Sequence, residues 1–218
     1  MYNVGFIPAR AGSKGIKSKN IADLAGKPLI WYSLATAQNS CLDKVYLSTD
    51  SEVIKDVVCS FGFDKVEVIS RSSETANDKA TSESALIEFA EKYEFDNVVF
   101  LQATSPFTKS TDVNGALEKF LHGEYNSLIS VVRNHQFIWS VDGIPSNYDP
   151  NNRPRRQDWD GYYIENGAFY ISTRENILKS SCRITPPVGV WEMPRISLTE
   201  IDTGEDMRLA EALINILH

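Results

Sequence analysis

The sequence has few cysteines, no long apolar run and no excess of basic residues. Cys41, Cys59 and Cys182 lie far apart and form no CxxC pair, which excludes a zinc ribbon or a disulfide framework. No apolar run approaches the roughly 20 residues that span a bilayer. The first residues also lack the basic and apolar regions of a signal peptide. We therefore expect a reduced, cytoplasmic protein with no membrane partner.

The charge balance excludes a general nucleic-acid binder. The chain of 218 residues carries a formal net charge of −7, whereas phosphate-backbone binding requires a broad basic face. Hydrophobic residues make up 42% and charged residues 23%, which is ordinary for a folded globular protein and excludes a disordered one. The length predicts a single domain over residues 1–218.

Short β-rich runs alternate with amphipathic segments over the first 132 residues. The predicted strands are residues 3–9, 44–49, 65–69, 97–102, 127–132 and 167–172. The predicted helices are residues 28–38, 51–61, 81–92, 111–122, 174–180 and 204–217, the last beginning at a Thr203–Asp206 capping box. This order is typical of a mostly parallel sheet with helices on both faces, which binds ligands beyond the carboxyl ends of its strands. Polar motifs follow four of these strands, namely PARAGSKG, STD, RSSE and QATSP.

Residues 133–165 interrupt this pattern with several prolines, glycines and tryptophans. They predict irregular loops and a β-arm that are too poor in aliphatic residues to build a core of their own. We interpret them as a dimerisation or substrate arm of the same domain.

Residues 10–27 carry five basic side chains and a single carboxylate. Gly12 and Gly15 allow the backbone to turn tightly and to present its N–H groups, as a polyphosphate cradle requires. Their spacing fits neither the GxxxxGK[ST] phosphate loop nor the GxGxxG dinucleotide fingerprint. It fits the GxxG loop of RNA-binding KH domains, but the acidic chain argues against RNA. A solvated basic loop is the remaining alternative.

The run IPARAGSKGIKSKN followed by KPLI resembles the acylneuraminate cytidylyltransferases, or CMP-sialic acid synthetases. The segments SVVRNHQFIWS and RPRRQDWDGYYIENGAFY are similar to the animal enzymes, and EIDTGED lies where the family carries a metal-binding aspartate motif. The resemblance implies a three-layer, Rossmann-like α/β nucleotidyltransferase fold, a homodimer, and dependence on Mg²⁺ or Mn²⁺. Related KDO cytidylyltransferases usually carry Arg where this chain has Lys14-Gly15.

The resemblance implies a specific reaction, in which CMP passes from CTP to the anomeric hydroxyl of N-acetylneuraminate and pyrophosphate is released. The partners are then CTP and a nine-carbon 2-keto sugar acid. Two alternatives remain open: the same reaction on another nonulosonic acid such as legionaminate, and a non-catalytic nucleotide-binding module on the same fold.

The resemblance also assigns residues to the nucleotide. The catalytic, phosphate-handling cations are Arg10, Lys14 and Lys19. The further CTP-binding positions are Ala9, Gly12, Ser13, Asn20, Arg71, Ala80 and Ser82. Each has a plainer interpretation from the sequence alone: Asn20 as a turn or cap residue, Arg71 as a loop cation, and Ser82 as a first-turn helix residue.

The acceptor and the metal are assigned in the same way. The sugar-binding positions are Gln102, Thr104, Ser105, Gln136, Arg156 and Tyr170. The first three also suit loop capping before Pro106, and Tyr170 also suits a core or interface position. The metal ligands are Asp202 and Glu200, where the family usually has Asp in place of Glu200. A strand over these residues would place both carboxylates on one face, whereas Asp206 suits the start of the last helix.

Overall fold

A seven-stranded sheet forms the centre of the computed structural model, which describes residues 1–12, 15–77 and 80–217. The strand order is β5-β4-β1-β6-β8-β7-β9. The strands are β1 (Asn3–Pro8), β4 (Lys44–Thr49), β5 (Val66–Ser70), β6 (Asn97–Leu101), β7 (Ser127–Asn134), β8 (Tyr162–Thr173) and β9 (Val188–Glu192). Only β8 runs antiparallel to its neighbours, so the predicted mostly parallel sheet is confirmed.

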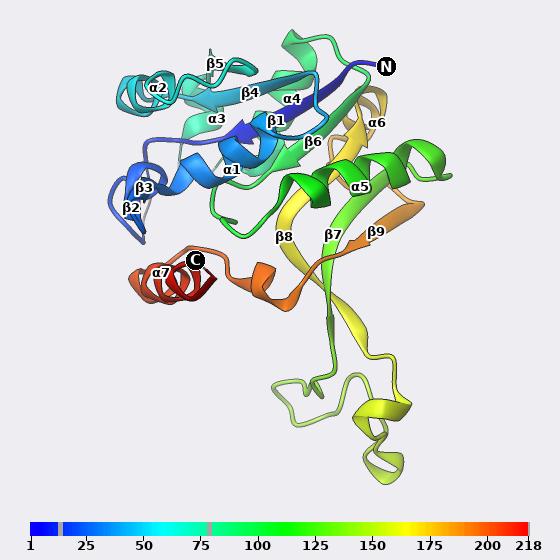
Figure 1. The fold of residues 1–218 in the computed structure, drawn as a ribbon. Helices are drawn as coiled ribbons and strands as arrows, with labels where there is room; N and C mark the ends of the chain where they lie inside the picture. The colour runs from blue at the N-terminus through cyan, green and yellow to red at the C-terminus, as the bar shows by residue number, and fades with distance from the viewer. Residues whose placement is uncertain (13–14, 78–79, 218) are drawn as a thin grey trace.

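Helices cover both faces of this sheet, which gives the three layers seen in Figure 1. One face packs against α1 (Leu29–Gln38), α2 (Glu52–Cys59) and α5 (Ser110–His122). The other face packs against α4 (Ser82–Lys92) and α6 (Arg174–Ser180). The six predicted helices are all present, and their bounds differ from the predicted ones by two residues or fewer. The spacing of the aliphatic residues predicts these helices well, because each helix buries one apolar stripe against a continuous apolar sheet.

The last helix, α7 (Gly204–Leu217), closes a smaller third core. It packs beside the hairpin of β2 (Asp23–Leu24) and β3 (Lys27–Pro28), with Leu24, Leu29 and Ile201 fully buried between them. The predicted capping box is confirmed: Thr203 N donates to Asp206 Oδ2 at 2.8 Å, and Asp206 N donates to Thr203 Oγ1 at 3.3 Å. The Thr203 hydroxyl also donates to Asp206 Oδ2 at 2.8 Å, and this bond, with those from the backbone N–H groups of Thr203 and Asp202, holds the pKa of Asp206 below its usual range.

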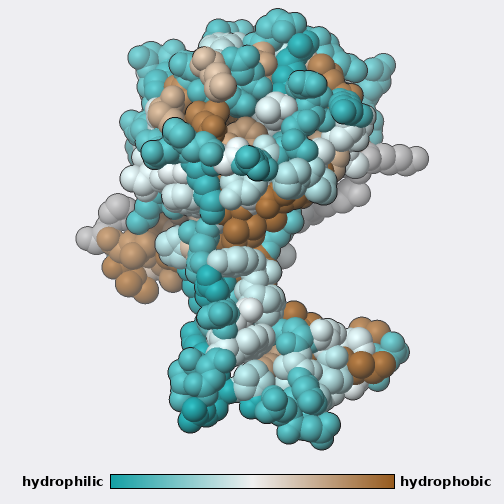
Figure 2. Space-filling view, turned by 90° about the vertical axis from the view of Figure 1, so that its right-hand side faces the viewer, coloured by the Kyte–Doolittle hydropathy of each residue, from teal (hydrophilic) through white to brown (hydrophobic). Residues whose placement is uncertain are grey.

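The arm projects from the body as a separate lobe below the sheet (Figures 1 and 2). Its two ends are regular, because β7 and β8 remain paired as far as Asn134 and Tyr162. The irregular part is therefore residues 135–161, shorter than predicted, with the one-turn 3₁₀ helices η2 (Pro150–Asn152) and η3 (Arg156–Asp158). Its interior is aromatic: the Phe137 ring stacks on Trp159 with centroids 5.3 Å apart, and Arg153 lies over Phe137.

Three further features bear on the sequence-based expectations. Strand β9 was not predicted, because VGVWE is only five residues long and contains a glycine. Cys41, Cys59 and Cys182 are free thiols. Among the helices that the structure describes, none has both the length and the apolar character needed to cross a membrane.

Candidate active site

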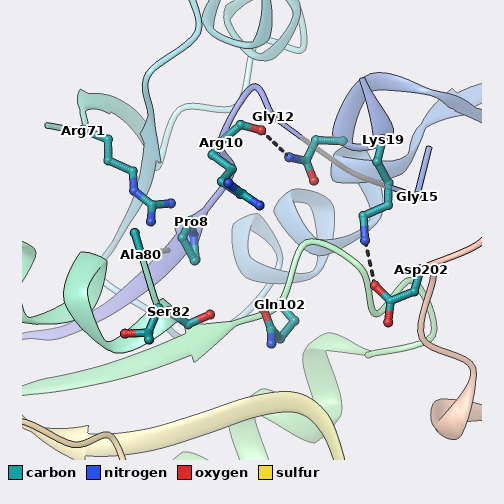
Figure 3. Close-up of a pocket in the computed structure, with 12 residues that line it drawn as sticks. Pro8, Arg10, Gly12, Gly15, Lys19, Arg71, Ala80, Ser82, Gln102 and Asp202 are labelled. Atoms are coloured by element: carbon teal, nitrogen blue, oxygen red, sulfur yellow. Dashed lines mark hydrogen bonds and ion pairs between the residues drawn. The ribbon is translucent and has the colours of Figure 1, made fainter. Parts of the chain in front are cut away.

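A cavity of about 400 Å³ opens at the carboxyl ends of the parallel strands. It lies beside the point where the strand order reverses, with β4 on one side of β1 and β6 on the other, which is where open α/β sheets bind their ligands. The loops after β1, β5 and β6 and the start of α4 meet there (Figure 3). The lining residues are Pro8, Arg10, Gly12, Gly15, Lys19, Asn20, Arg71, Ala80, Thr81, Ser82, Gln102 and Asp202.

The loop after β1 is held from three sides. Ala11 N donates to Asp50 Oδ1 at 2.8 Å, and Asn20 Nδ2 donates to the Arg10 carbonyl at 3.1 Å. On the far side Gly15 packs against the backbone of Asp202, so closely that a Cβ at Gly15 would overlap the Asp202 carbonyl oxygen. Asn20 thus stabilises the turn, as its plainer interpretation proposed, and also lines the cavity.

Lys19 and Asp202 form an ion pair across the cavity mouth (Figure 3). Lys19 lies in the 3₁₀ helix η1 (Lys19–Ile21), and its Nζ donates to Asp202 Oδ1 and to the Ile201 carbonyl, both at 2.8 Å. The lysine side chain is 14% exposed, whereas that of Asp202 is 68% exposed. The ammonium is therefore held in place, while the second carboxylate oxygen remains accessible to solvent and to a ligand.

Arg71 and the first turn of α4 form the opposite wall (Figure 3). Arg71 N donates to the Thr49 carbonyl at 3.0 Å, which places the residue directly after β5. Burial lowers the pKa of its guanidinium, and the carboxylates of Asp50 and Glu88 counteract this shift. Thr81 caps α4 by accepting from Ser84 N at 3.2 Å, so Ser82 is the first helical residue and lines the cavity.

The loop after β6 contributes one of its three predicted residues. Gln102 lines the cavity. Thr104 instead donates its hydroxyl to Glu200 Oε1 at 3.0 Å. Ser105 is 3% exposed, and its hydroxyl is buried with no hydrogen-bond partner among the described residues. Thr104 and Ser105 thus lie behind the cavity wall.

The two predicted metal ligands differ in exposure, since the Asp202 side chain is 68% exposed and Glu200 is half-buried. Residues 199–203 form no strand, so the expected alternation of the two side chains on one face is wrong. The Glu200 carboxylate lies against Thr104 and Gly167, and its burial raises its pKa. Within the described part of the chain no group of three His, Cys, Asp or Glu side chains could hold a metal ion. The exposed Asp202 still fits Mg²⁺, which often takes one protein carboxylate and completes its shell with phosphate oxygens and water.

The remaining predicted residues lie elsewhere. Ala9 is buried behind the loop, where its N–H donates to the Ser48 carbonyl at 2.9 Å. Tyr170 is a core residue, 4% exposed, whose hydroxyl donates to Glu165. This burial agrees with the alternative interpretation of Tyr170 as a core residue. Gln136 and Arg156 are exposed on the arm, away from the cavity of their own chain. Ser13 and Lys14 lie outside the described residues.

Two residues at the site were not assigned from the sequence. Pro8 lines the cavity, and Asp50 holds the loop after β1. The position of Asp50 at the end of the STD motif, directly after a strand, is a usable signal. Pro8 lies next to an assigned residue but carries no signal of its own.

A family model described as Cytidylyltransferase matches residues 4–203. The chain belongs to the cytidylyltransferase family. An N-acylneuraminate cytidylyltransferase from Oncorhynchus mykiss is 44% identical over 94% of this chain. N-acylneuraminate cytidylyltransferase B from Danio rerio is 38% identical over 96% of this chain. The chain spans about half the length of these two fish proteins. A pseudaminic acid cytidylyltransferase from Campylobacter jejuni is 33% identical and is matched over 98% of its own length.

Solved structures agree with this family's fold. A CMP:2-keto-3-deoxy-manno-octonic acid synthetase complexed with CTP superposes with a TM-score of 0.75 at 20% identity, over the whole of both chains. A 4-diphosphocytidyl-2C-methyl-D-erythritol synthase from Anaerococcus prevotii superposes with a TM-score of 0.73 at 14% identity, over 98% of this chain and 96% of that one. At these identities the likeness shows the fold alone, and it confirms the predicted nucleotidyltransferase architecture.

Proposed function

We propose that this chain transfers CMP from CTP to the anomeric hydroxyl of N-acetylneuraminate and releases pyrophosphate. The observation that carries the proposal is the grouping of three cationic side chains, those of Arg10, Lys19 and Arg71, around one cavity that also contains the carboxylate of Asp202. The names of the fish relatives favour the same acceptor. The free cysteines suit the reducing cytoplasm, where we place the reaction.

In the proposed reaction the anomeric oxygen attacks the α-phosphorus of CTP, and the bond to the bridging oxygen of the pyrophosphate breaks. Negative charge grows on the phosphoryl oxygens and on the leaving group, so the site needs cations and accurate positioning more than a covalent nucleophile. Arg10 and Lys19 would contact the triphosphate, together with backbone N–H groups of the loop after β1. The resemblance to the family motif adds Lys14 to these phosphate-binding residues.

The base and the acceptor would occupy different walls of the cavity. Arg71 supplies donors suited to the O2 and N3 acceptors of cytosine, and the backbone at Ala80–Ser82 can receive its exocyclic amine. Gln102, at the end of β6, would contact the sugar acid.

A divalent cation, Mg²⁺ or Mn²⁺, would bind at the exposed oxygen of Asp202. When bound, such an ion neutralises charge on the phosphate oxygens. Lys19 orients the carboxylate through its other oxygen. Glu200, which accepts from Thr104, would support this segment and not ligate the ion directly.

The Campylobacter relative favours a second acceptor for the same chemistry. It is a pseudaminic acid cytidylyltransferase, and this chain covers nearly all of it. The same cavity residues would handle CTP, and only the sugar contacts would differ.

The proposal is tested by pyrophosphate release with Mg²⁺ and CTP, comparing N-acetylneuraminate, legionaminate, pseudaminic acid and KDO as acceptors. We expect release with N-acetylneuraminate and CTP, and none when ATP replaces CTP. Release with another nonulosonic acid alone would move the assignment to that acceptor. Binding of CTP without release for any acceptor would favour the non-catalytic nucleotide-binding module.

We also propose that the arm within residues 133–165 pairs two copies of the chain and carries Gln136 and Arg156 to the partner's cavity. Its surface exposes Trp139 (51%), Val141 (103%) and Ile144 (62%), an unusual concentration of apolar area on a small lobe. Figure 2 shows apolar residues gathered on one end of this lobe.

Sedimentation should therefore give the mass of two chains, not the 24.4 kDa of one. The double change Trp139→Asp and Val141→Asp should shift the population toward the monomer and lower activity with it. A wild-type monomer of compact shape would contradict the proposed role of the arm.

A further inference from the structure

A half-buried carboxylate on α4, that of Glu88, receives several hydrogen bonds from the loop after β5. Glu88 Oε1 accepts from Ser72 N at 3.2 Å, and Oε2 accepts from Ser72 Oγ at 3.0 Å and from Thr75 Oγ1. On its solvent side Lys92 Nζ lies 2.5 Å from Oε1. The Glu88 side chain is only 14% exposed, whereas Lys92 is 56% exposed. These bonds hold the pKa of Glu88 below its usual range despite its burial.

The loop that Glu88 contacts has little apolar anchoring. Its single helical turn, α3 (Ser73–Ala76), has no buried residue among its four described positions. A turn of this length is unstable by itself, because helix nucleation is unfavourable and so short a segment cannot offset it. Hydrogen bonds to a neighbouring element must then supply much of its local stability, and three of them end on one carboxylate.

The helical turn α3 also determines where the Arg71 guanidinium lies. Arg71 Nη2 donates to the Thr75 carbonyl, and Thr75 is one of the two residues that Glu88 holds. Arg71 lines the cavity, and so do Ala80, Thr81 and Ser82 at the start of the helix that carries Glu88. The carboxylate therefore connects the two segments that form one wall of the cavity.

We propose that Glu88 is a positioning residue for nucleotide binding, which holds Arg71 and the first turn of α4 in register for the base. The inference rests on the proposed function only in that the base is taken to be cytosine. Glu88 does not line the cavity. It acts through Thr75 on Arg71, and Arg71 acts on the ligand.

The Glu88→Ala variant should raise the KM for CTP about tenfold, because a charge-assisted contact to the ligand is misplaced. The kcat should change less than about threefold, since base contacts are equally strong in the ground state and the transition state. The KM for the sugar acid should stay the same, and the preference for CTP over UTP should fall. Glu88→Gln, which keeps one acceptor oxygen, should recover part of the affinity.

Lys92→Met is the matched control, because it removes the ion pair and leaves the bonds to Ser72 and Thr75 in place. It should leave the KM for CTP and the CTP preference unchanged. If Glu88 has only a structural role, Glu88→Ala should lower the Tm and leave both the KM for CTP and the preference for CTP over UTP unchanged. That result would overturn the inference.

Titration calorimetry with CTP separates this inference from the proposed reaction. If the wild type binds CTP but releases no pyrophosphate, the reaction is wrong, and about tenfold weaker binding by Glu88→Ala would still support the inference. If Glu88→Ala binds CTP as tightly as the wild type does, the inference alone is overturned. If the wild type binds no CTP at all, both are overturned.

Discussion

Asp202→Asn is expected to lower the rate of CMP transfer by about 100-fold or more at any fixed Mg²⁺ concentration, because a metal's charge stabilisation of phosphoryl transfer is worth several kcal/mol. Asparagine keeps an oxygen that can accept from Lys19 Nζ, so the 2.8 Å contact and the local backbone are preserved. What the substitution removes is the negative charge that a hard divalent cation requires. The measurement is pyrophosphate release as a function of Mg²⁺ concentration.

Asp206→Asn is the companion variant for Asp202. Asp206 lies four residues further on, but its carboxylate caps α7 and does not line the cavity. The Asp206→Asn variant should be less stable to unfolding than the wild type and should keep the same Mg²⁺ requirement for activity. Mn²⁺ binding in the presence of CTP should weaken in Asp202→Asn only. An unchanged metal titration in Asp202→Asn would place the cation elsewhere.

Gly15→Ala should also lower turnover by about 100-fold, although it adds a single methyl group. The new Cβ would overlap the Asp202 carbonyl oxygen, and a backbone atom cannot move aside as a flexible side chain can. The loop after β1 would separate from the segment that carries Asp202, and a displacement of about 1 Å costs on the order of 100-fold in rate. Both Lys19 and Asp202 would be displaced, so the KM for CTP and the kcat should change together.

Gly12→Ala is the matched comparison, since it makes the same chemical change in the same loop. Among the described residues, a Cβ there would meet only the Arg10 Nη1 atom, at 3.8 Å, which is ordinary van der Waals contact. Its loss of activity should therefore be far smaller than that of Gly15→Ala. Equal losses in the two variants would show that loop flexibility, and not the packing of Gly15 on Asp202, is the important property. Circular dichroism should show a native fold in both.

The regular elements could be predicted because their signals are local. The run KVYLST is a strand at the predicted bounds, and residues 174–180 and 204–217 are helices at theirs. KVYLST is a short β-rich run that is buried along most of its length, and the last helix buries Ala210 and Ile214, which are four residues apart. The arm was located correctly, but its ends were not, because the pairing of Asn134 with Tyr162 joins residues far apart in sequence.

The residues of the candidate site also divide into those that local sequence signals identified and those that they did not. Arg10, Gly12, Arg71 and Gln102 could be assigned to one edge of the sheet because each follows a strand, and parallel strands end together. The family motif added Lys19 and Asp202. The expected placement of Glu200 and Asp202 on one face of a strand was wrong, because the structure forms no strand there.

The sequence by itself determined the order of six strands and six helices, the basic loop after the first strand and the family to which the chain belongs. Only the tertiary structure decided that Lys19 pairs with Asp202, 183 residues away, that Gly15 touches the same segment, and that Glu88 holds the turn beside Arg71. The physical reason is that helical and strand periodicity reflects burial within one element. Contacts between loops instead depend on how several elements pack, and no single stretch of the chain encodes that arrangement.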